Sequence, residues 1–263
     1  MMLKEPHFTL RLANSREDQQ AAQRLRYKVF VEELGGNGPL VDHAGRLEAD
    51  RFDPFFDHLI LVDERRNRAD LDHVVGVYRL MRGAQAARAG QFYTEDEYTL
   101  APLRDSGRRL LELGRSCVHR DYRGGTAMHQ LWSGLAAYID DYKIDVLFGV
   151  ASFHGTDLAA LASPLSLLYA RHLAPPELRV RAHDHLYQAM DLMAGDVLDR
   201  RSAMLKVPTL IKAYLRLGGF VGDGAYIDHA FNTTDVCVVM DTARLSSRYS
   251  GYYSPGSLRL KPS

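Results

Sequence analysis

Residues 111–125 read LELGRSCVHRDYRGG, and this stretch, with the segments next to it, decides the fold. The run 110–118 has the composition of a strand, and Gly124 and Gly125 then interrupt the chain before a helical pattern. A helix is predicted there because apolar residues recur at helical spacing, at Met128, Leu131, Trp132, Leu135, Ala136 and Ile139. The apolar run 145–151 predicts the next strand. A strand, a helix and a strand in this order form a right-handed crossover with parallel neighbours, so the sequence predicts a mixed α and β fold.

Periodicity places the other elements on either side of this unit. Upstream, we expect a strand at 8–12, a helix capped by Ser15 and Asp18, strands at 58–62 and 74–80, and an irregular segment at 82–107. The upstream helix is expected to present one apolar face, formed by Ala22, Leu25 and Val29. Downstream, we expect helices at 156–172 and 202–217, a strand near 187–192, and a strand at 235–241 that closes the sheet. No linker is convincing, so residues 1–248 are predicted to form a single domain with helical additions around 156–217, and 249–263 a loosely ordered tail.

Composition excludes several classes of protein. The 33 basic residues balance the 33 acidic ones, so no overall field recruits nucleic acid. Cys117 and Cys237 are far apart and lack metal-ligand spacing, which argues against a disulfide scaffold or a zinc site and favours the cytoplasm. No apolar run approaches the roughly 20 residues needed to cross a bilayer, and the charged N-terminal segment does not read as a signal peptide. We therefore expect a soluble protein or one that lies on a membrane surface.

The stretch 111–125 also carries candidate chemistry. Glu112 and Arg115 lie on one predicted strand, ahead of a basic, glycine-containing turn at a helix N-terminus. Such a turn suits a phosphate, for example that of a pantetheine arm, because free backbone N–H groups and the positive end of the helix dipole meet there; an ordinary strand-to-helix turn has the same pattern. Strict alternation would leave Glu112 and Arg115 on opposite faces as separate surface charges. A bulge near Gly114 would instead bring both toward one cleft.

Seven segments resemble a known family, in the same order, over roughly residues 25–241. They read LRYKVFVEELG at 25–35, DHL at 57–59, VGVYRL at 75–80, LELGRSCVHRDYR at 111–123, ASFHGT at 151–156, VGDG at 221–224 and FNTTDV at 231–236. The family is that of the ornithine N-alpha-acyltransferases of bacterial ornithine-lipid synthesis, within the N-acetyltransferase-like (GNAT) superfamily.

This resemblance implies both a fold and a reaction. The fold is GNAT-like α/β, with a central mixed, mostly antiparallel sheet flanked by helices and a V-shaped cleft between the central strands. The reaction moves a fatty acyl group, a 3-hydroxyacyl group in particular, from acyl carrier protein to the α-amine of L-ornithine. The product is lyso-ornithine lipid, in the first step of ornithine-lipid biosynthesis. The donor is the 4'-phosphopantetheine thioester, no cofactor is tightly bound, and peripheral contact with the cytoplasmic face of the inner membrane is expected.

Direct attack of the amine on the thioester gives residues their expected roles. Glu112, directly or through one water, would take the proton of the amine, with Arg115 beside it in the catalytic site. Substrate binding is expected from Arg26, Phe30, Asp50, Asp53, Arg79 and Ser152. Pantetheine and phosphate are expected at Cys117, Val118, Arg123, Gly124, Gly125 and Thr126. The acid that binds the distal ammonium of ornithine is left open among Asp50, Asp53, Asp223 and Asp235.

The same layout also resembles the acyl-homoserine-lactone synthases. Their pattern matches Arg26, Phe30, Asp50, Asp53, Arg79, Glu112 and Arg115. The chain departs from that family at 34–38, LGGNG, where a tryptophan is usual, and from the coenzyme A loop, where Thr126 and Met128 replace small residues. Acyl carrier protein is therefore the expected donor. The alternatives are a lactone synthase that uses S-adenosylmethionine, an N-acyltransferase for another amino acid such as glutamine, and a non-catalytic module that binds acyl carrier protein or lipid.

Some groups have two interpretations. Arg79 is either a substrate ligand or a structural partner of the acidic loop 48–53. Cys117 is either a nucleophile or, as strand alternation favours, a buried apolar side chain. The segment 206–216 is either a membrane-surface or carrier-protein helix or, as its spread of apolar residues favours, a core helix. No metal is assigned, because His183 and His185 lack a well-spaced third ligand.

Overall fold

The structure is a computed structural model that describes residues 7–244. Its strands are β1 (Phe8–Leu12), β2 (Asp57–Asp63), β3 (Val74–Arg82), β4 (Tyr98–Thr99), β5 (Leu110–Val118), β6 (Val146–His154), β7 (Arg181–Ala182), β8 (Phe220–Val221), β9 (Tyr226–Asp228) and β10 (Thr233–Asp241). Its α-helices are α1 (Arg16–Arg26), α2 (Gly83–Ala89), α3 (Ala101–Arg104), α4 (Ala127–Tyr142), α5 (Leu158–His172), α6 (Arg200–Lys206) and α7 (Thr209–Arg216). A π-helix, η1 (Tyr27–Glu33), continues α1, and short 3-10 turns lie at η2 (Asp53–Phe55), η3 (Tyr93–Asp96), η4 (Arg120–Tyr122), η5 (Pro176–Leu178) and η6 (Thr242–Arg244).

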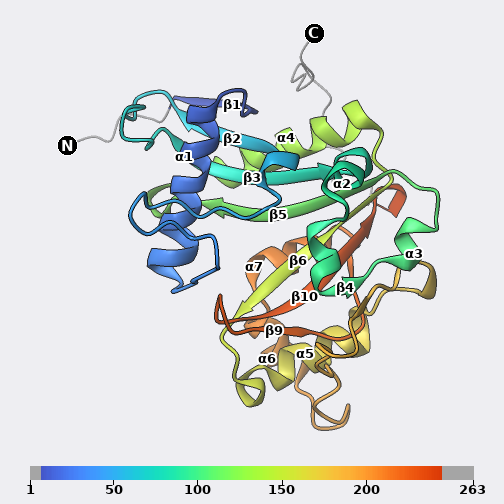
Figure 1. Cartoon of the computed structure of the whole chain (residues 1–263). Coiled ribbons are helices and arrows are strands. Elements are labelled where there is room, and N and C mark those ends of the chain that lie inside the picture. Colours follow the sequence, from blue (N-terminus) through green and yellow to red (C-terminus); the bar gives the residue numbers. More distant parts are fainter. Residues whose placement is uncertain (1–6, 245–263) are drawn as a thin grey trace. The chain divides into compact units, whose positions relative to one another are not determined.

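The hydrogen-bonded strand order is β1-β2-β3-β5-β6-β10-β8, and β9 pairs with β10. Figure 1 shows β6 beside β10. β5 and β6 are parallel, whereas β6 and β10 are antiparallel along their whole length. The expected mixed, mostly antiparallel α/β fold is therefore confirmed. Within the described residues the chain divides into two compact units, 7–81 with 113–143 and 82–112 with 144–244. The expected single domain stays a prediction, and the expected tail, 249–263, lies outside the described residues.

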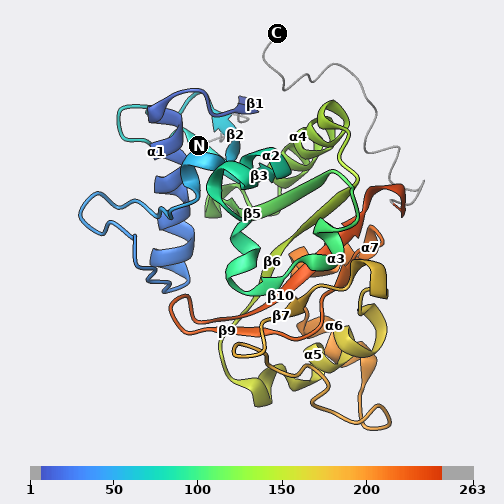
Figure 2. The same cartoon turned by 45° about the vertical axis from the view of Figure 1, so that its right-hand side comes forward.

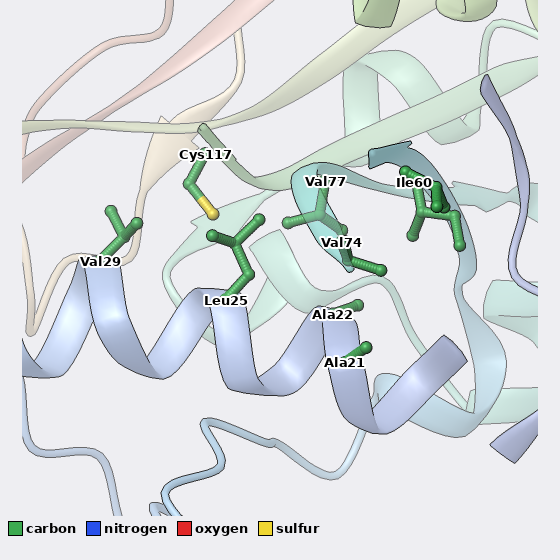
Figure 3. Close-up of a cluster of buried hydrophobic side chains, with 9 residues drawn as sticks. Ala21, Ala22, Leu25, Val29, Ile60, Val74, Val77 and Cys117 are labelled. Carbon is green, nitrogen blue, oxygen red and sulfur yellow. The ribbon is translucent and has the colours of Figure 1, made fainter. Parts of the chain in front are cut away.

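In the first unit, α1 begins where the sequence predicts. The Ser15 hydroxyl accepts the backbone N–H of Asp18 at 3.1 Å and caps the helix. One face of α1 and η1 packs against the strands, as Figure 3 shows for the buried cluster of Ala21, Ala22, Leu25, Val29, Ile60, Val62, Val74, Val77 and Cys117. Cys117 is thus a buried apolar side chain, as alternation favoured.

α4 confirms the helix predicted from the apolar spacing and covers the opposite face of these strands. Its buried residues are Ala127, Leu131, Gly134, Leu135 and Tyr138. Gly134 lets the helix approach closely, because a Cβ there would lie 2.8 Å from a methyl group of Leu10 and 3.1 Å from Leu59. Met128, Trp132 and Ile139 are only partly buried, on the sides of the helix.

The second unit corrects three expectations about the chain. Residues 187–192 form no strand, and only an isolated bridge joins Gln188 to Ala225. The helix expected at 202–217 is two helices, α6 and α7, because Pro208 forces Val207 into an extended conformation. The segment 82–107 is not irregular, since it contains α2, η3, β4 and α3, which are too short to produce a periodic pattern.

The remaining elements of the second unit occur near their expected places. α5 begins after an Asp157 N-cap, close to the expected start at 156. α5 and α6 pack together through Leu167, Leu198 and Ala203, and both views show these helices side by side (Figures 1 and 2). β10 starts two residues before the expected strand and is followed at the sheet edge by β8.

Candidate functional site

The basic turn between β5 and α4 lies in the first unit. The Arg123 Nε donates to the carbonyl oxygen of Val118 at 3.0 Å, and its guanidinium pairs with Glu33 at 2.8 Å. Gly124 has a φ of +76°, a conformation that favours glycine, and the side chain of Thr126 makes no capping hydrogen bond at the start of α4. Backbone N–H groups at this helix start are therefore not consumed by a side-chain cap.

Most of the expected pantetheine residues lie together in this turn, from Val118 through Arg123 and Gly124 to Gly125 and Thr126. The side chain of Cys117 lies apart, in the apolar cluster of Figure 3. Burial raises the pKa of its thiol to about 12, so the thiol stays protonated at neutral pH.

A buried ion network forms in the first unit around two fully buried arginines. Arg26, at the end of α1, donates to Glu48 at 2.5 Å and to Asp53 at 2.8 and 2.9 Å. Arg79, on β3, donates to Asp50 at 2.6 Å and to Asp53 at 2.7 Å. The side chains of Arg26 and Arg79 have no exposed surface, and Asp53 is 3% exposed. Arg79 is therefore a structural partner of the acidic loop, whatever else it binds.

Arg115 completes this ion network, which we define as Arg26, Glu48, Asp50, Asp53, Arg79 and Arg115. Arg115 lies 3.2 Å from Glu48 and 3.4 Å from Asp50, and the side chains of Arg115 and Asp50 are each 16% exposed. The backbone of Arg115 has a φ of +49°, which is rare for a residue with a side chain and interrupts the extended strand. The irregularity expected near Gly114 thus falls on the next residue.

The charges in this ion network determine its protonation. Burial by itself would raise the pKa of Glu48, but attraction to Arg26, Arg115 and Arg79 lowers it to about 2. Burial, reinforced by Arg26, lowers the pKa of neighbouring His58 to about 4. His58 is therefore neutral at pH 7, with its Nε2 3.1 Å from the carbonyl oxygen of Asp53.

In the second unit, Glu112 is 1% exposed and lies on the part of β5 that pairs with β6. Its Oε2 accepts the backbone N–H of Tyr93 at 2.9 Å. Its Oε1 accepts the backbone N–H of Thr94 at 2.6 Å and the Thr94 hydroxyl at 2.5 Å. Glu112 is thus not the exposed surface charge that strict alternation allowed.

Ser152 and Asp235 lie on the same side of the second unit's strands as Glu112. Glu112 is in register with Phe148 on β6, Ser152 lies four residues further along β6, and Asp235 on β10 is opposite Ser152. Directly opposed residues point to one face of a sheet, as do residues an even number apart along a strand. Ser152 is exposed and Asp235 is buried.

The other expected residues are distributed as follows. Phe30 is partly buried and packs against the apolar cluster of Figure 3. Asp223 pairs with Arg181 at 2.5 Å and accepts the Tyr187 hydroxyl at 2.9 Å. Among the four acids considered for the distal ammonium, Asp50, Asp53 and Asp223 are therefore each bound to arginine.

Two residues at these sites were missed by sequence reasoning. Glu48 belongs to the acidic loop that the sequence singled out, and its spacing of two residues from Asp50 was the available signal. Thr94 had no local signal, because it lies in a four-residue 3-10 turn and reaches Glu112 across 18 positions of sequence.

Comparisons with known proteins agree with this architecture. The acetyltransferase (GNAT) domain family matches residues 25–133. An L-ornithine N(alpha)-acyltransferase from Rhodobacter capsulatus is 58% identical over 94% of this chain and 95% of its own length. A protein of the same name from Brucella abortus is 47% identical over 93% of this chain and 88% of its own length. The solved structure of BjaI, a CoA-dependent acyl-homoserine lactone synthase, with SAM and isopentyl-CoA has a TM-score of 0.55 at 13% identity, covering 98% of this chain and 95% of that one. That likeness concerns the fold alone.

Proposed function

The chain belongs to the L-ornithine N(alpha)-acyltransferase family, and we propose that it transfers a 3-hydroxyacyl group from acyl carrier protein to the α-amine of L-ornithine, forming lyso-ornithine lipid. The observation that carries this proposal is the 58% identity to a protein of that name over nearly the whole of both chains. The buried ion network and the anchored Glu112 add support, because they include every expected catalytic residue.

The proposed reaction is direct acyl transfer. The α-ammonium first loses a proton to the Glu112 carboxylate, and the resulting amine attacks the thioester carbonyl carbon. The C–N bond forms, the C–S bond breaks, and the departing sulfur takes the second proton from nitrogen, which leaves an amide and the free thiol of the carrier. The first proton returns from Glu112 to solvent. Arg115, with part of its side chain exposed, is proposed to bind the substrate carboxylate.

The basic turn is the proposed site for the phosphate of the pantetheine arm. Gly124 and Gly125 carry no side chains that would block an approaching phosphate, and a Cβ added at Gly124 would meet no atom within 4 Å. Arg123 is 47% exposed and supplies a positive charge next to these amides. Acyl carrier protein, as donor, would place its phosphate here.

Peripheral membrane contact is a further part of the proposal. None of the helices within residues 7–244 combines the length and the apolar character that a membrane span requires. The segment 200–216 contains Arg200, Arg201, Lys206, Lys212 and Arg216 and no acidic residue. Leu205 in this segment is 75% exposed, whereas Ile211 and Tyr214 are buried as core residues. Cations around an exposed leucine suit an anionic bilayer surface. Flotation measures this contact: the wild type is expected to bind phosphatidylglycerol vesicles better than neutral vesicles and better than the Leu205→Ser variant does. Equal binding in all three measurements would rule out the proposed membrane contact.

The decisive experiment is mass spectrometry of products formed from 3-hydroxyacyl carrier protein and an equimolar mixture of the common amino acids with ornithine. We expect acyl-ornithine as the main product. An acylated glutamine or other amino acid would keep the reaction and replace the substrate. A lactone formed only with added S-adenosylmethionine would instead identify a homoserine-lactone synthase. If no product forms, the remaining interpretation is a non-catalytic module that binds acyl carrier protein or lipid.

A further inference from the structure

Thr94 supplies two of the three hydrogen bonds described above for the Glu112 carboxylate. Its backbone N–H and its hydroxyl both donate to Oε1, while the N–H of Tyr93 donates to Oε2. Thr94 has no exposed surface and Glu112 has 1%. A carboxylate held at both oxygens by fixed donors keeps one orientation, because rotating it would break these bonds in a buried place.

The donors belong to the first residues of η3, so Glu112 satisfies amides that the turn itself cannot. The first N–H groups of any helical turn lack partners within that turn. Phe92, which precedes η3, has its own N–H bound by the Glu95 side chain at 2.7 Å. The amides of Tyr93 and Thr94 are directed to Glu112. The turn and the carboxylate therefore fix one another.

Other residues of the second unit hold η3 in place. The carboxylate of Glu95 binds Arg104 at 2.7 Å, and the carbonyl oxygen of Glu95 is 2.9 Å from the His183 ring. The Phe92 ring packs edge-on against Phe148, with 5.0 Å between ring centroids. Phe148 is the residue of β6 in register with Glu112. The donors to Glu112 are thus anchored to the same strand pair as the carboxylate.

We propose that Thr94 is a positioning residue for the acyltransfer reaction, and that its hydroxyl aims the Glu112 carboxylate at the amine of the substrate. Oε1 accepts two bonds from Thr94 and Oε2 accepts one from Tyr93, so we expect the proton to be taken up at Oε2. This inference rests on the proposed function, in which Glu112 is the base. It adds a residue that touches neither substrate and acts through Glu112 alone.

The test makes two comparisons in the product assay: Thr94→Val with the wild type, which are isosteric, and Thr94→Ala with Thr94→Ser, which differ by one hydroxyl group. Loss of the hydroxyl is expected to lower kcat by on the order of 10- to 100-fold, with KM for both substrates near the wild-type value. Thr94→Ser keeps the hydroxyl and is expected to keep most of the turnover. If Thr94→Val does not fold, the comparison of Ala with Ser still isolates the hydroxyl. Thr9→Val, on β1 at the edge of the sheet, is the control and is expected to leave kcat unchanged.

A double-mutant cycle then separates positioning from a merely structural role. In the Glu112→Gln background, Thr94→Val is expected to have little further effect on kcat, because there is no base left to aim. Additive losses in this cycle, equal losses in the Ser and Ala variants, or near-normal turnover in Thr94→Val would each overturn the proposal. Acyl-ornithine formation by the wild type in the same assay keeps these failures distinct from failure of the proposed function, which would show as an inactive wild type.

Discussion

The two units of the molecule bury carboxylates in different ways. In the first unit, Glu48, Asp50 and Asp53 are bound to three arginines, so full opposite charges compensate one another. In the second unit, the three hydrogen bonds described for Glu112 come from two backbone amides and a hydroxyl, which carry no net charge.

This difference separates structural acids from a candidate base. Arginines close to a carboxylate favour its charged form, as the pKa of about 2 at Glu48 illustrates, and such a group accepts a proton poorly. The donors described for Glu112 are neutral, and its charge also contributes, after the larger effects of Glu95, to the raised pKa of Arg104. We therefore expect the acids of the ion network to support the fold and bind substrate, and Glu112 to move the proton.

The largest expected effect follows from removing the base. Glu112→Gln keeps the size of the side chain and should lower kcat by about 10²–10⁴-fold, the usual contribution of a general base. Glu17→Gln, on the exposed side of α1, is the matched control. Turnover is measured by release of free carrier thiol, and the melting temperature shows whether the variant folds. Near-normal turnover in a folded Glu112→Gln protein would show that Glu112 is not the base. The contrast between structural acids in the first unit and a base in the second would then fail.

The next effect tests the ion network. Arg26→Met removes the cation that Glu48 and Asp53 bind and leaves both acids buried. Breaking a buried ion pair in this way typically lowers the free energy of unfolding by about 3–5 kcal/mol. Urea denaturation measures the free energy of unfolding, with Arg16→Met on the exposed start of α1 as control, expected within about 0.5 kcal/mol of wild type. A loss below about 1 kcal/mol would mean that the buried arginine is not needed to compensate these acids.

Local patterns in the sequence predicted the fold and the contents of the first unit better than those of the second. The N-cap at Ser15, the face of α1 and the crossover from β5 to β6 follow from short-range patterns that the structure retains. η3 and β4 were missed, because elements of four and two residues have no periodicity to detect. The spacing of apolar residues predicted α4 but not that Gly134 lies on its buried face, where the missing side chain allows a close approach to Leu10 and Leu59.

The candidate site shows the same limit. The acids and arginines of the ion network were chosen from the sequence, but their mutual pairing depends on contacts such as Arg26 with Asp53, 27 positions apart. The position of the strand irregularity could also not be predicted to the residue, since Arg115 rather than Gly114 adopts the positive φ. Thr94 could not be predicted, because only the folded second unit brings it to Glu112.

A smaller effect is expected in the pH dependence of stability. Burial lowers the pKa of His58 from 6.5 to about 4, so the folded protein binds its proton less readily than the unfolded chain. The stability from neutral His58 is complete above pH 6.5 and is lost as the pH falls toward 4, by on the order of 3 kcal/mol at most. Burial also lowers the pKa of His73, which acts in the same direction. His58→Leu should flatten the slope of unfolding free energy against pH in this window. A slope equal to that of the wild type would contradict a neutral His58.

The smallest expected effect concerns stability, which we expect to depend on how deeply each acid of the ion network is buried. Asp53 is 3% exposed and accepts bonds from Arg26 and Arg79, whereas Asp50 is 16% exposed and pairs with Arg79 and Arg115. Water screens the more exposed pair, so Asp50→Asn should cost about 1 kcal/mol of unfolding free energy and Asp53→Asn several times as much. The Asp50→Asn variant should still have a higher KM for the amino acid, since Asp50 pairs with Arg115, the residue proposed to bind the substrate carboxylate. Equal stability losses in the two variants would show that exposure does not order this network, and an unchanged KM would restrict Asp50 to holding the arginines.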